Sequence, residues 1–423
     1  MKFLLIGNHT CGNRGDAAIL RGLIAELEAQ YPQAELTITS RYPISSSYLL
    51  GRPVVKDLFH EWHKKLCRSF VGKVAERLLK HAIPLALSLL VDGKASWIKG
   101  CLPRFFRDQM AALAEYDLVI QVGGSFFVDL YGSSQFDYPL TALVAGRPVV
   151  LIGHSMGPFE GHIMRRLSAC LLQHSALVSL REPVSKELVQ RYGLPMTKLH
   201  EGGDTAWLVR PVDAASEVLA WFGRRHEQRP VVAITVRELA PFDKRLKTTQ
   251  LAYEKAFAKL ADSLINDGYD VLAVSTCTGI DSYHRDDRMN ALQVKAHVAH
   301  TEHFEVVMDE LNDVQLGQVL SQCDLLIGTR LHSAIIAMNF GTPAIAVNYE
   351  HKSEGIMRQL GLDDMAATVP SLLDGTLISR AKTVLANKAE MAATVSDAVA
   401  RERSRTAKMI TTCIEQAIGQ DSR

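Results

Sequence analysis

The chain has 423 residues, and its 47 lysines and arginines nearly balance 46 aspartates and glutamates. This balance argues against bulk binding to nucleic acid, and the length leaves room for two to three domains with buried cores. Seven scattered cysteines without a Cys-x-x-Cys pair are typical of reduced cytosolic thiols, not of a disulfide framework or a zinc site.

The first residues carry no signal for export. The apolar run after Met1 is shorter than that of a signal peptide, and no run of about 18 apolar residues is present to span a membrane. We therefore expect a cytoplasmic protein.

A short apolar strand at residues 2–6 runs into the loop GNHTCGNRGD at 7–16, and an amphipathic helix is predicted over 16–30 with Asp16 as its N-cap. The loop is placed like a phosphate-binding turn but lacks both Gly-x-Gly-x-x-Gly and a Walker motif, which disfavours a nicotinamide or P-loop nucleotide. Two interpretations stay open: a close backbone approach to a ligand, or a tight turn between strand and helix.

After a second strand at 35–39, residues 56–110 form a basic helical insertion. Helical spacing places four apolar side chains on one face, Leu66, Phe70, Val74 and Leu78, with most of the lysines and arginines elsewhere. Such a segment either lies on an anionic membrane surface or packs on the domain as a helical hairpin with solvated lysines.

Further buried strands are predicted at 117–122, 149–152 and 177–180. The first of them ends at Gly123 and Gly124, and the turn at 202–204 contains Asp204. Strands that alternate with helical stretches predict a doubly wound parallel sheet, which we assign to an N-terminal domain at 1–212.

The alternation of strands and helices restarts in a second domain, 213–375. Strands are expected at 231–236, 270–274, 305–308, 324–328 and 344–347, with helices at 249–266 and 313–321 and after residue 330. Residues 376–423 read as one or two helices that return towards the first domain. The predicted fold class is α/β, with two Rossmann-like parallel-sheet domains and a C-terminal helical tail.

Polar side chains follow the strands of the second domain. They are Arg237, Thr276, Arg330, His332, Glu350 and Lys352. Parallel strands bring their carboxyl ends to one edge of the sheet, where ligands bind. Fixed cations near a helix N-terminus suit a small ligand with more than one anionic group, and a histidine there can transfer a proton. The residues alone predict group transfer from a small anionic donor, and they leave the donor open.

Six stretches resemble the polysaccharide pyruvyl transferases, in particular those of colanic acid and amylovoran exopolysaccharide biosynthesis in bacteria. The stretches are 7–16, 121–129, 203–207, 237–245, 275–283 and 328–333, and they span nearly the whole chain in order. The resemblance implies a GT-B-like fold, with two domains facing across a cleft. It also implies transfer of an enolpyruvyl group from phosphoenolpyruvate to a sugar of the repeating unit, forming a pyruvate ketal and releasing phosphate.

The resemblance further implies roles for single residues. Arg237 and Arg330 would clamp the donor, helped by backbone amides of Leu331 and Ser333, and His332 would act as acid and base. Other residues expected on the donor side are Thr276, Lys244, Glu350 and Lys352. Those expected to contact the acceptor are Asn8, Asn13, Asp16, Gly123, Gly124 and Asp204. The two aspartates among them either bind sugar hydroxyls or cap helices.

The expected partners follow from this assignment. They are phosphoenolpyruvate and a lipid-linked oligosaccharide, with no nucleic acid, no cofactor and no metal. A lipid-linked acceptor would bring the basic insertion to the inner membrane face. Two alternatives stay open: a nucleotide-sugar-dependent glycosyltransferase on the same fold, and a non-catalytic scaffold of the exopolysaccharide assembly machinery.

Overall fold

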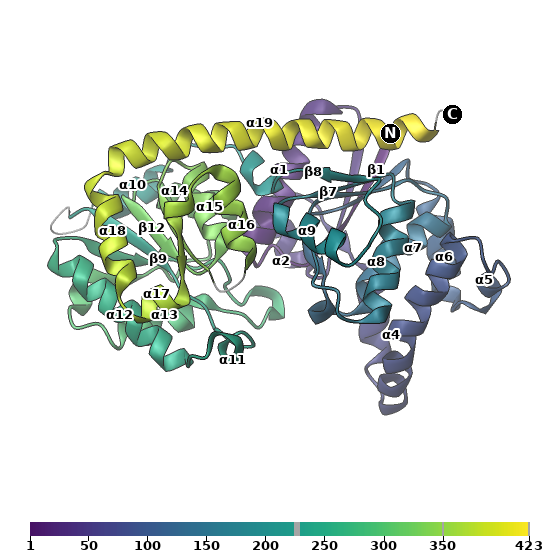
Figure 1. Ribbon diagram of the computed structural model, residues 1–423, viewed down its shortest axis with the longest axis horizontal. Coiled ribbons are helices and arrows are strands. Elements are labelled where there is room, and N and C mark those ends of the chain that lie inside the picture. The colour runs from purple at the N-terminus through teal and green to yellow at the C-terminus, as the bar shows by residue number, and fades with distance from the viewer. Residues whose placement is uncertain (224–228, 349–350, 422–423) are drawn as a thin grey trace.

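The computed structural model describes residues 1–223, 229–348 and 351–421. Two parallel β-sheets, built from residues 2–201 and 231–368, lie side by side with helices around them, and one long C-terminal helix runs along both (Figure 1). This arrangement confirms the predicted fold class of two parallel α/β sheets with C-terminal helices.

The N-terminal sheet contains β1 Lys2–Asn8, β2 Glu35–Ser40, β3 Val55–Lys56, β4 Leu118–Gln121, β5 Gly124–Phe127, β6 Val149–Met156, β7 Leu177–Leu180 and β8 Leu199–Glu201. Its order is β3-β2-β1-β4-β6-β7-β8, with β5 beside β6. The C-terminal sheet contains β9 Val231–Thr235, β10 Asp270–Ala273, β11 Phe304–Val306, β12 Leu325–Gly328, β13 Ala344–Asn348 and β14 Ala366–Thr368. Its order is β11-β10-β9-β12-β13-β14.

The helices around the N-terminal sheet are α1 Arg14–Gln30, α2 Pro43–Leu50, α3 Leu58–Leu66, α4 Phe70–Val91, α5 Ile98–Cys101, α6 Arg104–Leu113, α7 Asp137–Val144, α8 His162–His174 and α9 Pro183–Arg191. A short 3₁₀ turn, η3 Thr205–Leu208, and α10 Ser216–Gly223 lead to the second sheet. Its helices are α11 Asp243–Leu246, α12 Gln250–Asn266, α13 Asp287–Lys295, α14 Asp313–Leu320, α15 Leu331–Asn339, α16 His351–Leu360 and α17 Val369–Leu373. The chain ends in α18 Thr376–Ala386 and α19 Lys388–Asp421.

Three details differ from the expectations. Helix α1 begins at Arg14, and its N-cap is Asn13, whose side chain accepts a hydrogen bond from Gly15 N at 3.0 Å, so the prediction of Asp16 as N-cap is wrong. Strand β5 was not predicted, because the two glycines at 123–124 resemble a loop. Strand β11 ends at Val306, two residues before the predicted end.

Strand β1 shows why the sheets are buried on both faces. Phe3 and Leu5 point to one side of the sheet and Leu4 and Ile6 to the other, and each pair lies in a different hydrophobic cluster. The cluster with Phe3 continues through both sheets to Ile410 of α19. One continuous core therefore joins the N-terminal and C-terminal halves.

Helix α19 packs across both halves. Arg403 on this helix donates to Trp207 O at 3.0 Å and to Asn339 Oδ1 at 2.7 Å, which ties η3 to α15. A methyl group on Gly202 would lie 2.0 Å from Met409 Sδ, and one on Gly203 would lie 2.1 Å from Thr406 Oγ1. The two glycines before Asp204 therefore allow α19 to approach the sheet closely.

The basic insertion forms α3 to α6. The C-terminal half of α4 is buried against α7 and α8, whereas its N-terminal half projects from the body of the molecule (Figure 1). No helix among the described residues combines the length and the apolar character needed to cross a bilayer.

Candidate functional site

Two predicted arginines leave the C-terminal sheet side by side. Strands β9 and β12 are adjacent and parallel, with Thr235 paired to Gly328, and Arg237 and Arg330 each follow two residues later. The hydroxyl of Tyr253, on α12, accepts a hydrogen bond from Arg237 N at 3.2 Å and lies 2.6 Å from Thr329 Oγ1. Tyr253 therefore connects the two arginine loops.

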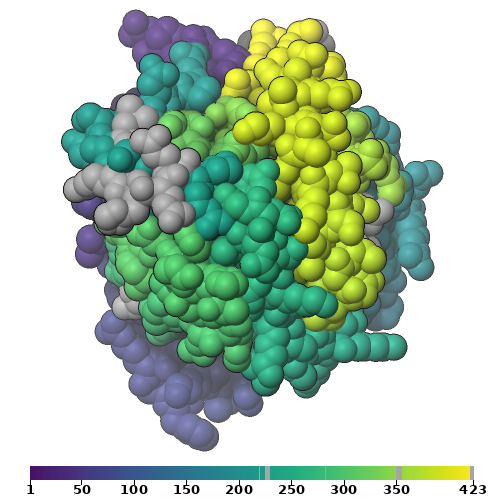
Figure 2. Space-filling view, turned by 90° about the vertical axis from the view of Figure 1, so that its left-hand side faces the viewer, coloured from purple at the N-terminus to yellow at the C-terminus, as the bar shows by residue number. Residues whose placement is uncertain are grey.

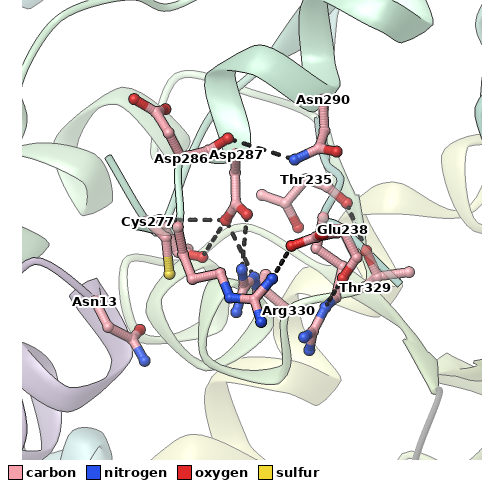
Figure 3. Close-up of polar contacts among 12 residues, drawn as sticks. Asn13, Thr235, Glu238, Cys277, Asp286, Asp287, Asn290, Thr329 and Arg330 are labelled. Carbon is pink, nitrogen blue, oxygen red and sulfur yellow. Dashed lines mark hydrogen bonds and ion pairs between the residues drawn. The ribbon is translucent and has the colours of Figure 1, made fainter. Parts of the chain in front are cut away.

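Arg330 is held by Asp287, the first residue of α13. The guanidinium donates through Nε to Asp287 Oδ2 at 3.1 Å and through Nη2 to Oδ1 at 2.7 Å (Figure 3). The Asp287 side chain is only 2% exposed and also accepts from Cys277 N at 3.2 Å and from Thr276 Oγ1 at 3.3 Å. This bidentate pair fixes the plane of the guanidinium. Sequence analysis missed Asp287, and the two adjacent aspartates at 286–287 are the signal that could have indicated it.

Arg237 is buried within its own loop. Its Nε donates to Glu238 O at 2.9 Å, and its guanidinium lies 5.3 Å from the centre of the Phe242 ring. Glu238 pairs with Arg285 across the loop. The expected donor residue Lys244 lies on α11 with an exposed side chain, and within the described ranges we find no contact between it and Arg330.

His332 reaches across to the N-terminal half. It lies in the first turn of α15, and its Nε2 is 3.2 Å from Asp204 Oδ2. Its ring packs on the start of α1, where a methyl group on Gly15 would lie 2.5 Å from His332 Nδ1. The site therefore lies where α1 and α15, from opposite halves, meet.

Asp204 anchors this contact. Its Oδ2 also accepts from Arg181 Nη1 at 2.7 Å, and its Oδ1 caps η3 by accepting from Ala206 N at 3.0 Å. Burial by itself favours the neutral carboxyl, but Arg181 and His332 together hold the pKa of Asp204 below its usual range. Asp204 is thus an ionised residue that orients His332, and its carboxylate oxygens are occupied. The expected direct contact with sugar hydroxyls does not fit this geometry.

Asp16 lies in the first turn of α1, next to these charges. Burial raises its pKa to about 6, although His332, Arg181 and Arg330 act in the opposite direction. A carboxyl with a pKa near neutrality can exchange a proton at physiological pH. Asp16 is therefore a second candidate for proton transfer in this site.

The other expected acceptor residues have structural roles. Asn13 caps α1, and the buried side chain of Asn8 donates to Asp16 O at 3.4 Å. Gly123 is buried between strands, where a methyl group would lie 2.7 Å from Gly153 O, and Gly124 adopts a φ of +151° against the ring of Phe126. Strand packing at Gly123 and the Phe126 ring at Gly124 account for these two glycines, and their approach to a ligand stays a prediction.

Two donor-side expectations also change. The amide of Ser333 donates to Arg330 O at 2.9 Å and its hydroxyl to the same oxygen at 2.6 Å, so Ser333 closes the first turn of α15 and its amide is occupied. Thr276 supports Asp287 through its hydroxyl. Leu331 packs on the core. Glu350 and the side chain of Lys352 lie outside the described residues.

An open pocket lies at the carboxyl ends of β1 and β4. It has a volume of about 100 Å³ and is lined by Gly7, Arg41, Asp57, Phe59, His60, His63, Glu76, Gln121, Ser134, Gln135 and Tyr138. Burial lowers the pKa of the neighbouring His9 to about 3, with a contribution from Arg41 and His60. Sequence analysis did not identify this pocket, because its residues come from six separate segments.

A short chain of contacts links this pocket to Arg330. The ring of His9 lies 5.7 Å from that of Tyr283, whose hydroxyl is 3.9 Å from Cys277 Sγ. Cys277 in turn donates its amide to Asp287. Another pocket, lined by Leu180, Lys186, Met196, Leu199, His200 and Glu201, contains none of the predicted site residues.

Comparisons with known proteins extend these observations. The model of the family described as "Polysaccharide pyruvyl transferase" matches residues 13–351. The amylovoran biosynthesis protein AmsJ of Erwinia amylovora is 48% identical over 406 residues, which cover 95% of this chain and 96% of that protein.

Among solved structures, Anabaena HepE in complex with UDP-glucose superimposes with a TM-score of 0.59 at 14% identity, covering 100% of this chain and 99% of its own. MnaA of S. aureus in complex with UDP also gives a TM-score of 0.59, at 12% identity, covering 99% and 97%. At these identities the likeness concerns the fold, and it confirms the expected GT-B-like class.

Proposed function

Because the chain belongs to the polysaccharide pyruvyl transferase family, we propose that it transfers an enolpyruvyl group from phosphoenolpyruvate to a sugar of an exopolysaccharide repeating unit. The product is a pyruvate ketal, and phosphate is released. The observation that carries this proposal is the placement of Arg237 and Arg330 after the ends of adjacent strands, with His332 two residues beyond Arg330 at the contact between the halves.

The donor fits two neighbouring guanidinium groups. Phosphoenolpyruvate carries a carboxylate and a phosphate on one carbon, and arginine pairs with either group through two parallel hydrogen bonds. Asp287 fixes Arg330 and Tyr253 fixes the loop of Arg237, so both arginines are positioned before the donor arrives. This preorganisation lowers the entropic cost of aligning the donor for reaction.

The chemistry needs groups that move protons. We propose that His332 donates the first proton to the methylene carbon of the donor. The carbon next to the methylene carbon then becomes cationic. A sugar hydroxyl adds to that carbon and loses its proton to a base, a role that we propose for Asp16. The bond to phosphate then breaks, and a second hydroxyl closes the ketal. The diol thus gives up two protons, one retained in the new methyl group and one carried away with phosphate.

We place the acceptor sugar in the pocket at the ends of β1 and β4. Polar side chains such as His60 and Glu76 can bind hydroxyls there, while Tyr138 and Phe59 provide apolar surface for a sugar ring. The contacts through His9 and Tyr283 connect this pocket to the arginine loops. This position replaces the acceptor contacts expected at Asn8, Gly123 and Gly124.

The test is a reaction in heavy water with phosphoenolpyruvate and an unpyruvylated repeating-unit oligosaccharide. We expect phosphate and pyruvylated sugar in equal amounts, with one deuteron in the new methyl group by NMR. His332→Ala should lose turnover. Release of UDP from UDP-glucose without pyruvylation would instead indicate a glycosyltransferase. If neither reaction occurs although phosphoenolpyruvate binds, the result would favour a scaffold that retains the donor site.

A further inference from the structure

The projecting half of α4 exposes an apolar stripe. Its residues share one helix face because they are spaced i, i+1, i+4 and i+8, and they are Phe70 (83% exposed), Val71 (78%), Val74 (48%) and Leu78 (69%). The rest of the helix is anchored, since Ile83 and Leu87 are buried. The N-terminal half of α4 forms the projection at the bottom of Figure 1, and the same part of the chain lies at the bottom of Figure 2. Side chains of this size are rarely left exposed together on a helix without a partner.

Cations border the stripe. Residues 64–82 contain six lysines and arginines against one acidic residue, Glu76. Glu76 faces the body of the protein, where it lies 3.8 Å from His63 Nδ1 and lines the pocket. Arg68, Lys73 and Arg77 are exposed, and the part of the chain that the structure describes offers none of them a carboxylate within ion-pair distance.

We propose that this surface, the α4 tip, binds the surface of an anionic phospholipid bilayer. The α4 tip comprises Phe70, Val71, Lys73, Val74, Arg77 and Leu78, with Lys64, Lys65 and Arg68 beside it. An apolar stripe bordered by lysines and arginines lies in the plane of the interface, with the apolar side chains among the lipid chains and the cations at the headgroups. The helix binds on the membrane and does not cross it, in agreement with its composition.

Charge decides between a bilayer and a second copy of the chain. Two copies joined through the α4 tip would bring like charges together, and such contacts are unfavourable. Anionic headgroups match both the sign and the distribution of the cations. A bilayer is therefore the partner that satisfies the apolar stripe and its border at once.

The α4 tip and the acceptor pocket belong to the same hairpin. His63 of α3 and Glu76 of α4 line the pocket, and the stripe begins at Phe70, within two helical turns of Glu76. Membrane binding would bring the pocket close to a saccharide carried on a lipid. This last link rests on the proposed function, whereas membrane binding by itself does not.

The test is co-sedimentation of the full chain with vesicles of phosphatidylglycerol and phosphatidylethanolamine, compared with neutral phosphatidylcholine vesicles. We expect binding to the anionic vesicles that weakens as salt is added. The double variant Phe70→Ser/Leu78→Ser should bind at least about tenfold more weakly, because it removes two large apolar side chains from the contact. Lys73→Glu/Arg77→Glu should lose the preference for anionic vesicles.

Matched controls lie elsewhere on the surface. Trp97→Ser removes an exposed aromatic side chain next to α5, and Lys255→Glu/Lys259→Glu repeats the charge reversal at the same helical spacing on α12. Both controls should bind vesicles as the wild type does. Unchanged binding by the α4 tip variants, or no binding by the wild type, would overturn the proposal. A wild-type dimer that the tip variants dissociate would show that a second copy is the partner.

One further measurement separates this proposal from the proposed function. Every variant should retain the thermal shift produced by phosphoenolpyruvate, since the α4 tip contains no donor residue. Loss of that shift in a tip variant would indicate misfolding. If the wild type shows no thermal shift with phosphoenolpyruvate, the result would contradict phosphoenolpyruvate as the donor. The vesicle result would still test membrane binding.

Discussion

At the scale of single residues, the site is a network of paired charges. Asp287 holds Arg330, and Arg181 holds Asp204, which in turn holds His332. Burying a charge is costly unless a partner compensates it, and Arg181 and Arg330 each have a carboxylate beside them. The pairing also fixes where the cations point.

The variant Asp287→Asn tests the support of Arg330. It keeps the shape of the side chain but removes the charge that the guanidinium faces, and breaking such a buried pair costs about 3–5 kcal/mol. We expect a clearly lower melting temperature and a raised KM for phosphoenolpyruvate. The neighbouring variant Asp286→Asn, whose carboxylate binds Arg288, is the matched control and should leave KM unchanged. Equal KM values for the wild type and Asp287→Asn would contradict the positioning role.

The variant Asp16→Asn tests the raised pKa of Asp16. The pKa of Asp16 in the folded chain, about 6, exceeds its ordinary value of 3.8. At pH values between these two, the folded chain therefore binds more protons than the unfolded chain. The protonated carboxyl of Asp16 makes its full contribution to stability below about pH 4, and this contribution is lost as the pH rises through 6. The resulting change in the free energy of unfolding is on the order of 2–3 kcal/mol. The variant should therefore be more stable than the wild type at pH 8 and similar at pH 4.

Urea unfolding at a series of pH values measures this difference. Asp108→Asn, which replaces an exposed carboxylate on α6, serves as the control for loss of one charge. A constant difference between Asp16→Asn and the wild type from pH 4 to pH 8 would contradict the assigned pKa.

Sequence patterns could predict the residues that end strands, but not their partners. Arg237, Arg330 and His332 follow apolar runs, and that position alone marks the carboxyl edge of a parallel sheet. Asp287 and Tyr253 support them from segments 43 residues before Arg330 and 16 residues after Arg237. Contacts over such separations depend on the packed fold, which local pattern does not encode.

At the scale of elements, the contact between α1 and α15 determines the geometry of the site. Gly15 in the first turn of α1 leaves room for the ring of His332. The variant Gly15→Ala should displace that ring, because the new methyl group would lie 2.5 Å from Nδ1. We expect kcat to fall while the binding of phosphoenolpyruvate, measured by its thermal shift, is retained.

Ala17→Gly, at a buried position in the same turn, controls for a general weakening of α1. It should lower stability by about 1 kcal/mol with little change in kcat. A Gly15→Ala enzyme with wild-type kcat would show that His332 tolerates displacement and is not the proton donor.

Strands and helices with strong periodicity were predictable, whereas short or glycine-containing ones were not. The apolar runs of β4, β6, β9 and β12 are long enough to stand out. Strand β5 begins with Gly124, whose φ is +151°, and at the preceding Gly123 a methyl group would lie 2.7 Å from Gly153 O of β6. The glycines at 202–203 were similarly associated with a loop, although they serve the packing of α19.

At the scale of the whole molecule, α19 holds the two halves together. Arg403→Ala removes hydrogen bonds to Trp207 O and to Asn339 Oδ1 and leaves buried acceptors without donors. We expect a loss of about 2–3 kcal/mol of stability. Arg401→Ala, on the exposed face of the same helix, is the control and should change stability by less than about 0.5 kcal/mol. Equal melting temperatures for the two variants would contradict the role of Arg403.

The measurement that tests the central claim most directly is thermal unfolding with phosphoenolpyruvate and with UDP-glucose, for the wild type and Arg330→Ala. A ligand at about 100 times its Kd stabilises the folded state by roughly 2.7 kcal/mol, which is visible as a shift in Tm. We predict a shift with phosphoenolpyruvate that disappears in Arg330→Ala and persists in His332→Asn. A shift in the wild type with UDP-glucose alone would contradict the assignment of phosphoenolpyruvate as the donor.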